Sequence, residues 1–178
     1  IYYNIEKSKT YIYMQDYTSS ENILINLLDE YSDNSMMRSE MSEANFIRGG
    51  IYLNYYHDFK KSQEFYQASI DKSKTSLFGK ESQKIINSIS SYNNLMDEIV
   101  YLNTIVDIDV DSEILESNPF SNPIPNILNK SIGLDSLIFN SAQILYFDLD
   151  IKDSAIYKFK YIIDEFPETN FHYKALIV

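Results

Sequence analysis

Three stretches of the chain repeat one pattern of apolar residues, and this repetition constrains the fold more than any other feature. In each stretch the apolar residues recur with the period of a helix. The stretches are "QDYTSSENILINLLDEYSDN", "HDFKKSQEFYQASIDKSKTS" and "KDSAIYKFKYIIDEFPETN". Only 4 Gly and 4 Pro occur in 178 residues, which disfavours a turn-rich β fold. The sequence therefore predicts an all-α chain.

The predicted helices divide the chain into two helical parts and a linker. Residues 104–130 contain clustered carboxylates followed by three prolines, and proline cannot continue a helix. We expect helical hairpins plus an extra helix over 1–103, an acidic, Pro-rich loop over 104–130, and a further hairpin with the start of a next repeat over 131–178. The individual helices are predicted over 2–14, 17–31, 43–56, 59–73, 77–103, 132–147, 151–166 and 170–178.

Small residues recur at matching places in the three stretches. Asp16-Tyr17 corresponds to Asp58-Phe59, and a small residue stands four positions before an apolar residue in each second helix. A small residue also occurs in each first helix, at twelve, twelve and thirteen residues before its counterpart, which suggests one inserted residue near "DLDI". We expect close helix crossings at these positions. The predicted packing residues are Ser8, Ser20, Gly50, Ser62, Tyr66, Ala142, Ala155, Phe159 and Pro167.

This arrangement resembles the tetratricopeptide repeat (TPR), a helix–turn–helix unit with the pattern W-x2-L-G-x2-Y … A-x3-F … P. The third stretch matches the second half of that pattern with Ala155, Phe159 and Pro167. The first stretch departs most, because Asn4 and Lys7 stand where bulky apolar residues are usual. The resemblance implies an α-α solenoid of TPR-like hairpins, with a concave groove that suits extended peptides and helices of partner proteins.

The ending "DEFPETNFHYKAL" supports a narrower resemblance, to bacterial envelope repeat proteins of the BamD and YbgF class. In that class the segment FP-(polar)-S-x-Y-x-x-KAL joins successive units. Pro167, Thr169, Tyr173, Lys174 and Ala175 fill these places, with Thr one position early in place of Ser. The resemblance implies a periplasmic or outer-membrane-associated protein involved in assembly. A cytoplasmic location stays open, because the absence of Cys fits either compartment.

Charge and composition exclude several classes of partner. The net charge of −11 and the absence of a basic segment disfavour nucleic acid and anionic lipid as partners. No apolar run approaches the roughly 18 residues that a membrane span needs, so we predict no membrane insertion of this chain.

The candidate chemical sites are weak. "DIDVDSE" starts like a calcium loop, but Ser112 replaces the required Gly and Asn118 the bidentate Glu, which favours a solvated acidic segment. His57 and His172 lack the spacing of a metal-binding helix, and no G-x-S-x-G motif occurs. We therefore predict no catalytic, cofactor or metal site, and no enzyme activity.

Tyrosines on the first helices are the candidate partner-binding residues. In the architecture that the TPR resemblance implies, first helices line the concave face, and tyrosine combines an apolar ring with a polar tip. The alternative is that these side chains fill the core between helices. The predicted partner-binding residues are Tyr11, Tyr52, Asn54 and Tyr55.

The leading functional hypothesis is a non-catalytic scaffold that binds a protein or peptide. The alternative is the helical regulatory or docking region of a larger enzyme or sensor. The chain begins without Met and stops in the apolar sequence "YKALIV". We therefore expect a segment of a longer protein, with an exposed apolar patch at its C-terminus.

Overall fold

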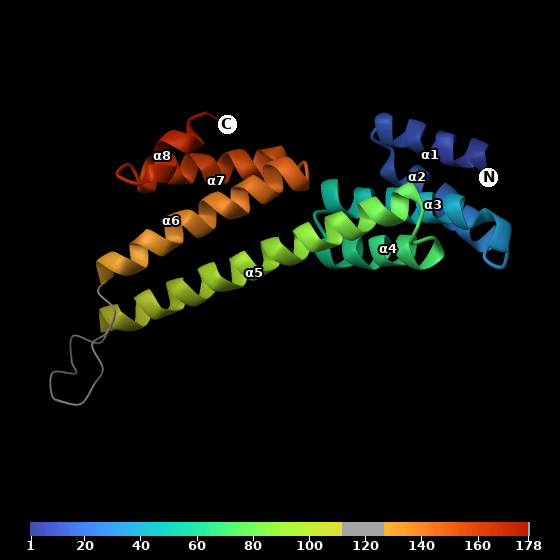
Figure 1. The fold of residues 1–178 in the computed structure, drawn as a ribbon. Helices are drawn as coiled ribbons and strands as arrows, with labels where there is room; N and C mark the ends of the chain where they lie inside the picture. The colour runs from blue at the N-terminus through green and yellow to red at the C-terminus, as the bar shows by residue number, and fades with distance from the viewer. Residues whose placement is uncertain (112–126, 178) are drawn as a thin grey trace, which may run out of the picture. The chain divides into compact units, whose positions relative to one another are not determined.

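The computed structural model describes residues 1–111 and 127–177, and within these ranges the chain is helical and has no strand (Figure 1). The all-α prediction is confirmed to this extent. The chain divides into two compact units, residues 1–89 and 90–178, and the division falls inside the long helix α5. Among the helices of the described ranges, none combines the length and apolar character that a membrane span requires.

The first unit contains two helical hairpins followed by the start of α5. The hairpins are α1–α2 and α3–α4, and α3 also packs against α1 and α2. A 3-10 turn, η1, leads into α3. The elements are α1 Tyr2–Tyr13, α2 Tyr17–Glu30, η1 Ser35–Met37, α3 Arg38–Asn54, α4 Phe59–Lys72 and α5 Leu77–Asp111.

The second unit contains the remainder of α5, a third hairpin and a short final helix. Helices α6 and α7 form the hairpin, and α8 packs against both of them (Figure 1). The first helix of the hairpin ends in a π-helical turn, η3. The elements are α6 Ile127–Gln143, η3 Ile144–Asp148, α7 Lys152–Glu165 and α8 Asn170–Ala175.

Each hairpin turns through one residue in the left-handed backbone region. Gln15, His57 and Asp150 have φ angles of 61°, 53° and 56°. This conformation costs most L-residues roughly 1–2 kcal/mol, but it reverses the chain directly after a helix. In the first two hairpins the next residue is an aspartate that caps the second helix. Asp16 accepts a hydrogen bond from the Ser19 amide, and Asp58 accepts one from the Lys61 amide.

The turns differ in width. The amide of Asp16 donates to the carbonyl of Tyr11, five residues back. The amides of Asp58 and Ile151 donate to carbonyls six residues back. The second and third hairpins therefore each have one more residue at the end of the first helix, where the third forms the π turn η3. The sequence predicted this extra residue only in the third hairpin.

Small residues lie where the two helices of each hairpin cross. The Ser8 and Ser20 hydroxyls are 2.8 Å apart and hydrogen-bonded in the first hairpin. In the third, Ala142 and Ala155 are fully buried. In the second, the Ser62 hydroxyl donates to the Gly49 carbonyl at 2.9 Å.

The crossing of the second hairpin corrects the prediction of Gly50. A Cβ atom added at Gly49 would lie 2.8 Å from the Tyr66 ring, whereas one at Gly50 would meet only the Tyr66 hydroxyl, at 3.7 Å. The wide turn after α3 explains the shift, because the extra residue moves the crossing one position back along the helix. Gly49, not Gly50, allows the close approach.

Apolar side chains next to the crossings form the cores. Leu24, Tyr66 and Phe159, each four residues after a crossing residue, are buried. Burial of such a side chain stabilises a fold by roughly 1.5–3 kcal/mol. Burial also raises the pKa of the Tyr66 phenol. The first hairpin and α3 share one core, which contains Ile5, Leu24, Leu27, Ala44 and Ile51.

The predicted loop over 104–130 is wrong at both ends. Helix α5 continues to Asp111, and α6 begins at Ile127. No Pro or Gly occurs between 104 and 111, and aspartates lower helix propensity by only a fraction of a kcal/mol, so the acidic residues do not end the helix. The three prolines and the last two residues of "DIDVDSE" fall in 112–126, outside the described residues.

Pro167 lies between α7 and α8. Helix α7 ends at Glu165, and the Thr169 hydroxyl caps α8 by accepting a hydrogen bond from the Phe171 amide. Helix α8 ends at Ala175 rather than continuing to the predicted 178, and position 178 is outside the described residues. Ala175 is buried, whereas Tyr173, Leu176 and Ile177 are 72%, 57% and 84% exposed. These three side chains form an apolar patch at the described C-terminal end.

Two glycine substitutions should have opposite effects on stability. A Cβ atom at Gly79 would clash with the Ser73 carbonyl oxygen, so Gly79→Ala must displace the backbone of the α4–α5 turn. We expect it to lower the free energy of unfolding by about 2 kcal/mol or more. At Gly133, in α6, no atom of the described residues lies within 4 Å of the added Cβ, so Gly133→Ala should raise the free energy of unfolding by about 0.5–1 kcal/mol. Urea denaturation of both variants measures these changes. Equal changes in the free energy of unfolding would contradict the close contact of Gly79 with the α4–α5 turn.

A charge at the third crossing should be costly. Ala155 is fully buried against α6, and Ala155→Asp would bury a carboxylate without a partner. We expect Ala155→Asp to lower the free energy of unfolding by about 3 kcal/mol or more. The matched control is Ser154→Asp, an exposed neighbour in the first turn of α7, where a carboxylate is favourable. If thermal denaturation shows similar small shifts for both variants, position 155 is not at a tight crossing.

Candidate functional site

The first unit contains an apolar hollow of about 310 Å³ at the edge of its core. Ile12 of α1, Tyr17 of α2 and Ile47 of α3 pack against that core and also line the hollow. Only Asn54 contributes an amide side chain, and none of the lining side chains is ionic. The full lining is Ile12, Tyr17, Phe46, Ile47, Gly50, Ile51, Asn54 and Tyr55.

Gly50 makes room for the hollow. It lies in α3 among the lining residues, and a side chain there would enter space that no nearby atom fills, apart from the Tyr66 hydroxyl at 3.7 Å. Any larger residue at position 50 would therefore occupy part of the cavity. The glycine that the sequence assigned to helix packing instead opens a surface.

Two tyrosines from different hairpins form one wall. The rings of Tyr17 and Tyr55 are stacked, with centroids 3.7 Å apart. Tyr55 remains 50% exposed, and Asn54 beside it is exposed, so this wall reaches solvent. The hollow thus has an apolar interior and a rim that carries a phenol and an amide, which are both able to donate and accept hydrogen bonds.

The structure separates the four predicted partner-binding residues. Asn54 and Tyr55 line the hollow. Tyr11 lies instead on a broad surface of α1 that Lys7 also lines, with the Lys7 ammonium 5.9 Å from the Tyr11 ring centre. The Tyr52 hydroxyl donates to Glu21 Oε1 at 2.8 Å and so joins α3 to α2.

The other lining residues were not predicted from the sequence. Ile12, Phe46 and Ile47 belong to the same helical stripes as core residues, so their pattern gave no separate signal. Tyr17 did carry a signal, because it follows the helix-capping Asp16. Tyr55, which was predicted, likewise lies directly after the end of a helix. Their stacking nevertheless depends on how the first hairpin packs on α3, which the sequence pattern does not specify.

A half-buried polar cluster joins α3 to its neighbouring helices. Glu21 Oε1 accepts hydrogen bonds from Tyr52 Oη at 2.8 Å and from Arg48 Nη2 at 3.2 Å. The Arg48 guanidinium also lies 3.9 Å from the centre of the Phe65 ring. These contacts join α2, α3 and α4. Burial, the hydrogen bond to Glu21 and the Glu21 charge raise the pKa of Tyr52 to about 12, although Arg48 opposes the shift.

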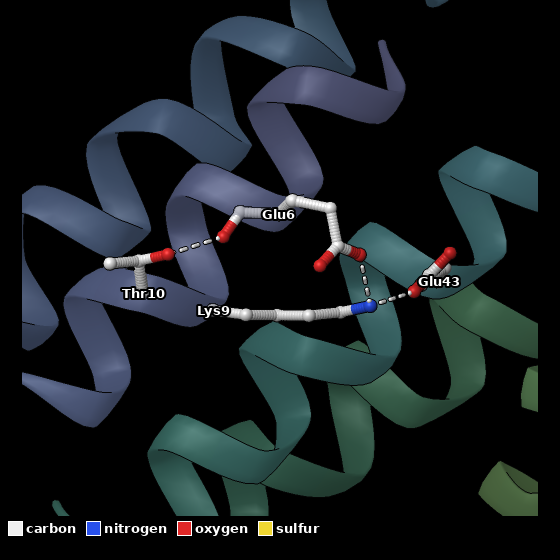
Figure 2. Close-up of polar contacts among 4 residues, drawn as sticks. All are labelled: Glu6, Lys9, Thr10 and Glu43. Carbon is white, nitrogen blue, oxygen red and sulfur yellow. Dashed lines mark hydrogen bonds and ion pairs between the residues drawn. The ribbon is translucent and has the colours of Figure 1, made fainter.

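A second ionic contact joins α1 to α3 close to the hollow. The Lys9 ammonium lies 2.8 Å from Glu6 Oε1 and 2.7 Å from Glu43 Oε1. Figure 2 shows the lysine side chain between the two carboxylates. Burial alone would lower the pKa of Lys9, but the hydrogen bonds and charges of Glu43 and Glu6 outweigh it and raise the pKa. Lys9 lies one turn before Ile12 and helps to fix the lining helices.

The described residues offer no metal site. Among residues 1–104 and 133–177, whose side chains the structure describes, no three His, Asp or Glu side chains gather as metal ligands would. His57 lies in the turn of the second hairpin with φ 53°, and His172 lies in α8 with its ring against Tyr173.

Comparisons of the chain with models of protein families, with curated proteins and with solved structures gave no match.

Tyr52 should make stability depend on alkaline pH. Its pKa is raised in the fold to about 12, against roughly 10 for an unfolded tyrosine. The protonated phenol therefore contributes stability that is complete below about pH 10 and is lost as pH rises towards 12. We expect the free energy of unfolding to fall less steeply over this interval in Tyr52→Phe than in the wild type. Tyr13→Phe, at an exposed residue of α1, is the control. Identical slopes for wild type and Tyr52→Phe would show that the fold does not raise the pKa of Tyr52.

Proposed function

We propose that the chain is a non-catalytic scaffold that binds a protein or peptide through the hollow of its first unit. The observation that carries this proposal is the hollow itself, with its apolar lining, which includes Gly50, and its exposed residues Asn54 and Tyr55. An apolar cavity of about 150 Å³ holds a benzene molecule. A hollow of about 310 Å³ therefore has room for one or two large apolar side chains.

The proposed partner is an amphipathic helix or an extended peptide with one aromatic or aliphatic anchor. The anchor would lie against Ile47 and Ile51, above Gly50. The Asn54 amide and the Tyr55 hydroxyl would then bond to the partner's backbone. Interfaces of this kind derive most of their affinity from a few anchor residues in water-excluded pockets. The net charge of −11 favours a neutral or basic partner.

The proposed architecture is a TPR-like array. Three observations support it: three helical hairpins, small residues at each crossing, and a left-handed residue at each turn. In such an array first helices supply the binding face, and six of the eight lining residues come from α1 or α3, the first helices of their hairpins.

A peptide-display selection tests the proposal. The chain contains no Trp, so peptides with a single Trp anchor can be followed by their own fluorescence. We expect selected peptides to bind with a Kd on the order of 1 μM, and Gly50→Met, which fills the hollow, to weaken binding about tenfold or more. Gln67→Met, on the exposed face of α4, is the matched control and should leave affinity unchanged.

The variants are suited to this test, because Gly50→Met adds a side chain where space exists and also raises helix propensity. Loss of folding is therefore not expected to account for lost binding, and circular dichroism checks this point. If selected peptides bind Gly50→Met as tightly as the wild type, the hollow is not the binding site.

A narrower proposal concerns location. The Pro167–Ala175 segment, with its capping Thr169 and buried Ala175, supports placement in the bacterial envelope through its resemblance to the BamD and YbgF class. Cell fractionation of the native protein tests it, and recovery with soluble cytoplasmic markers would contradict it.

A further inference from the structure

A second hollow, in the unit of residues 90–178, contains a lysine that pairs with no carboxylate among the side chains that the structure describes. The hollow has a volume of about 240 Å³ and lies among α5, α6 and α7 of that unit. Ile99, Leu134 and Ile138 give it an apolar lining, and Tyr157 and Tyr161 are exposed at its rim. Its two remaining lining residues are Asn103 and Lys158.

Lys158 is half-buried and makes only weak contacts. Its ammonium donates to Met96 Sδ at 3.4 Å and lies 5.8 Å from the centre of the Tyr92 ring. Burial lowers the pKa of Lys158. Among residues 1–104 and 133–177, whose side chains the structure describes, no carboxylate lies within ion-pair distance of it, whereas the exposed Lys152 pairs with Asp150 at 2.9 Å. A partly desolvated cation without a counter-ion is costly, and a bound carboxylate would recover part of that cost.

We propose that this hollow binds a small apolar carboxylic acid, with its carboxylate on the Lys158 ammonium and its apolar group against Ile99, Leu134 and Ile138. The Asn103 amide can donate a further hydrogen bond to the acid. The ammonium lies beside Met96, one helical turn before Ile99, so the carboxylate lies at that end of the hollow. This site belongs to the other unit and is independent of peptide binding by the first.

The volume sets the size of the ligand. A cavity of about 150 Å³ accommodates one benzene ring. The 240 Å³ of this hollow therefore suit a single ring or branched group with a short acid chain. The negative net charge of the protein does not prevent binding, because charges farther away than about 8 Å are largely screened at physiological ionic strength.

Binding of 3-phenylpropionate to the whole chain tests the proposal, with uncharged 3-phenylpropanamide as the matched ligand. We expect a Kd on the order of 1 mM for the acid by NMR titration, and at least tenfold weaker binding of the amide. Lys158→Met keeps an apolar chain of similar length and removes the charge, so it should also weaken binding of the acid at least tenfold. Lys160→Met, two residues away and exposed, should bind as the wild type does.

Several results would overturn the proposal. They are the absence of saturable binding up to about 20 mM acid, equal affinity for acid and amide, and unchanged affinity of Lys158→Met. If Lys158→Met does not fold, wild-type NMR decides the matter. Nuclear Overhauser effects between the phenyl ring and the methyl groups of Ile99 and Ile138 would support the site, and their absence would overturn it.

Discussion

The close crossing of two helices within each hairpin is the constraint on which the rest of the structure depends. Helices approach closely only where their facing residues are small, and here these are paired serines, a glycine with a serine, and paired alanines. The close approach brings the apolar residue one turn farther along the second helix, such as Tyr66 or Phe159, into the core. A bulkier or charged residue at a crossing would separate the helices and expose both.

The turn that precedes each second helix decides which residue lies at the crossing. A left-handed residue reverses the chain, and the amide after it donates to a carbonyl five or six residues back. The wider form in the second hairpin places Gly49 against Tyr66 and leaves Gly50 without a packing role. The same one-residue difference therefore sets the helix packing and opens the hollow that we propose as the binding site.

The two hollows differ in chemistry in a way that suggests different ligands. The first is apolar and uncharged, with Asn54 and Tyr55 at an exposed rim, which suits an anchor side chain of a peptide. The second is smaller and includes Lys158, whose ammonium has no carboxylate partner among the described residues. A carboxylic acid of matching size would supply the negatively charged partner of this ammonium. Each proposal rests on the local geometry of its own unit.

The sequence by itself determined the helical class, the positions of most helices and the small residues of the first and third crossings. These features are local, because they depend on the apolar period, helix caps and prolines. Of the residues that line the first hollow, the sequence predicted only Asn54 and Tyr55 as partner-binding residues. The shift from Gly50 to Gly49 and the pairing of Tyr17 with Tyr55 were decided by the tertiary structure. They depend on turn width and on packing between hairpins, and apolar periodicity is the same for a residue in the core and a residue that lines a cavity beside it.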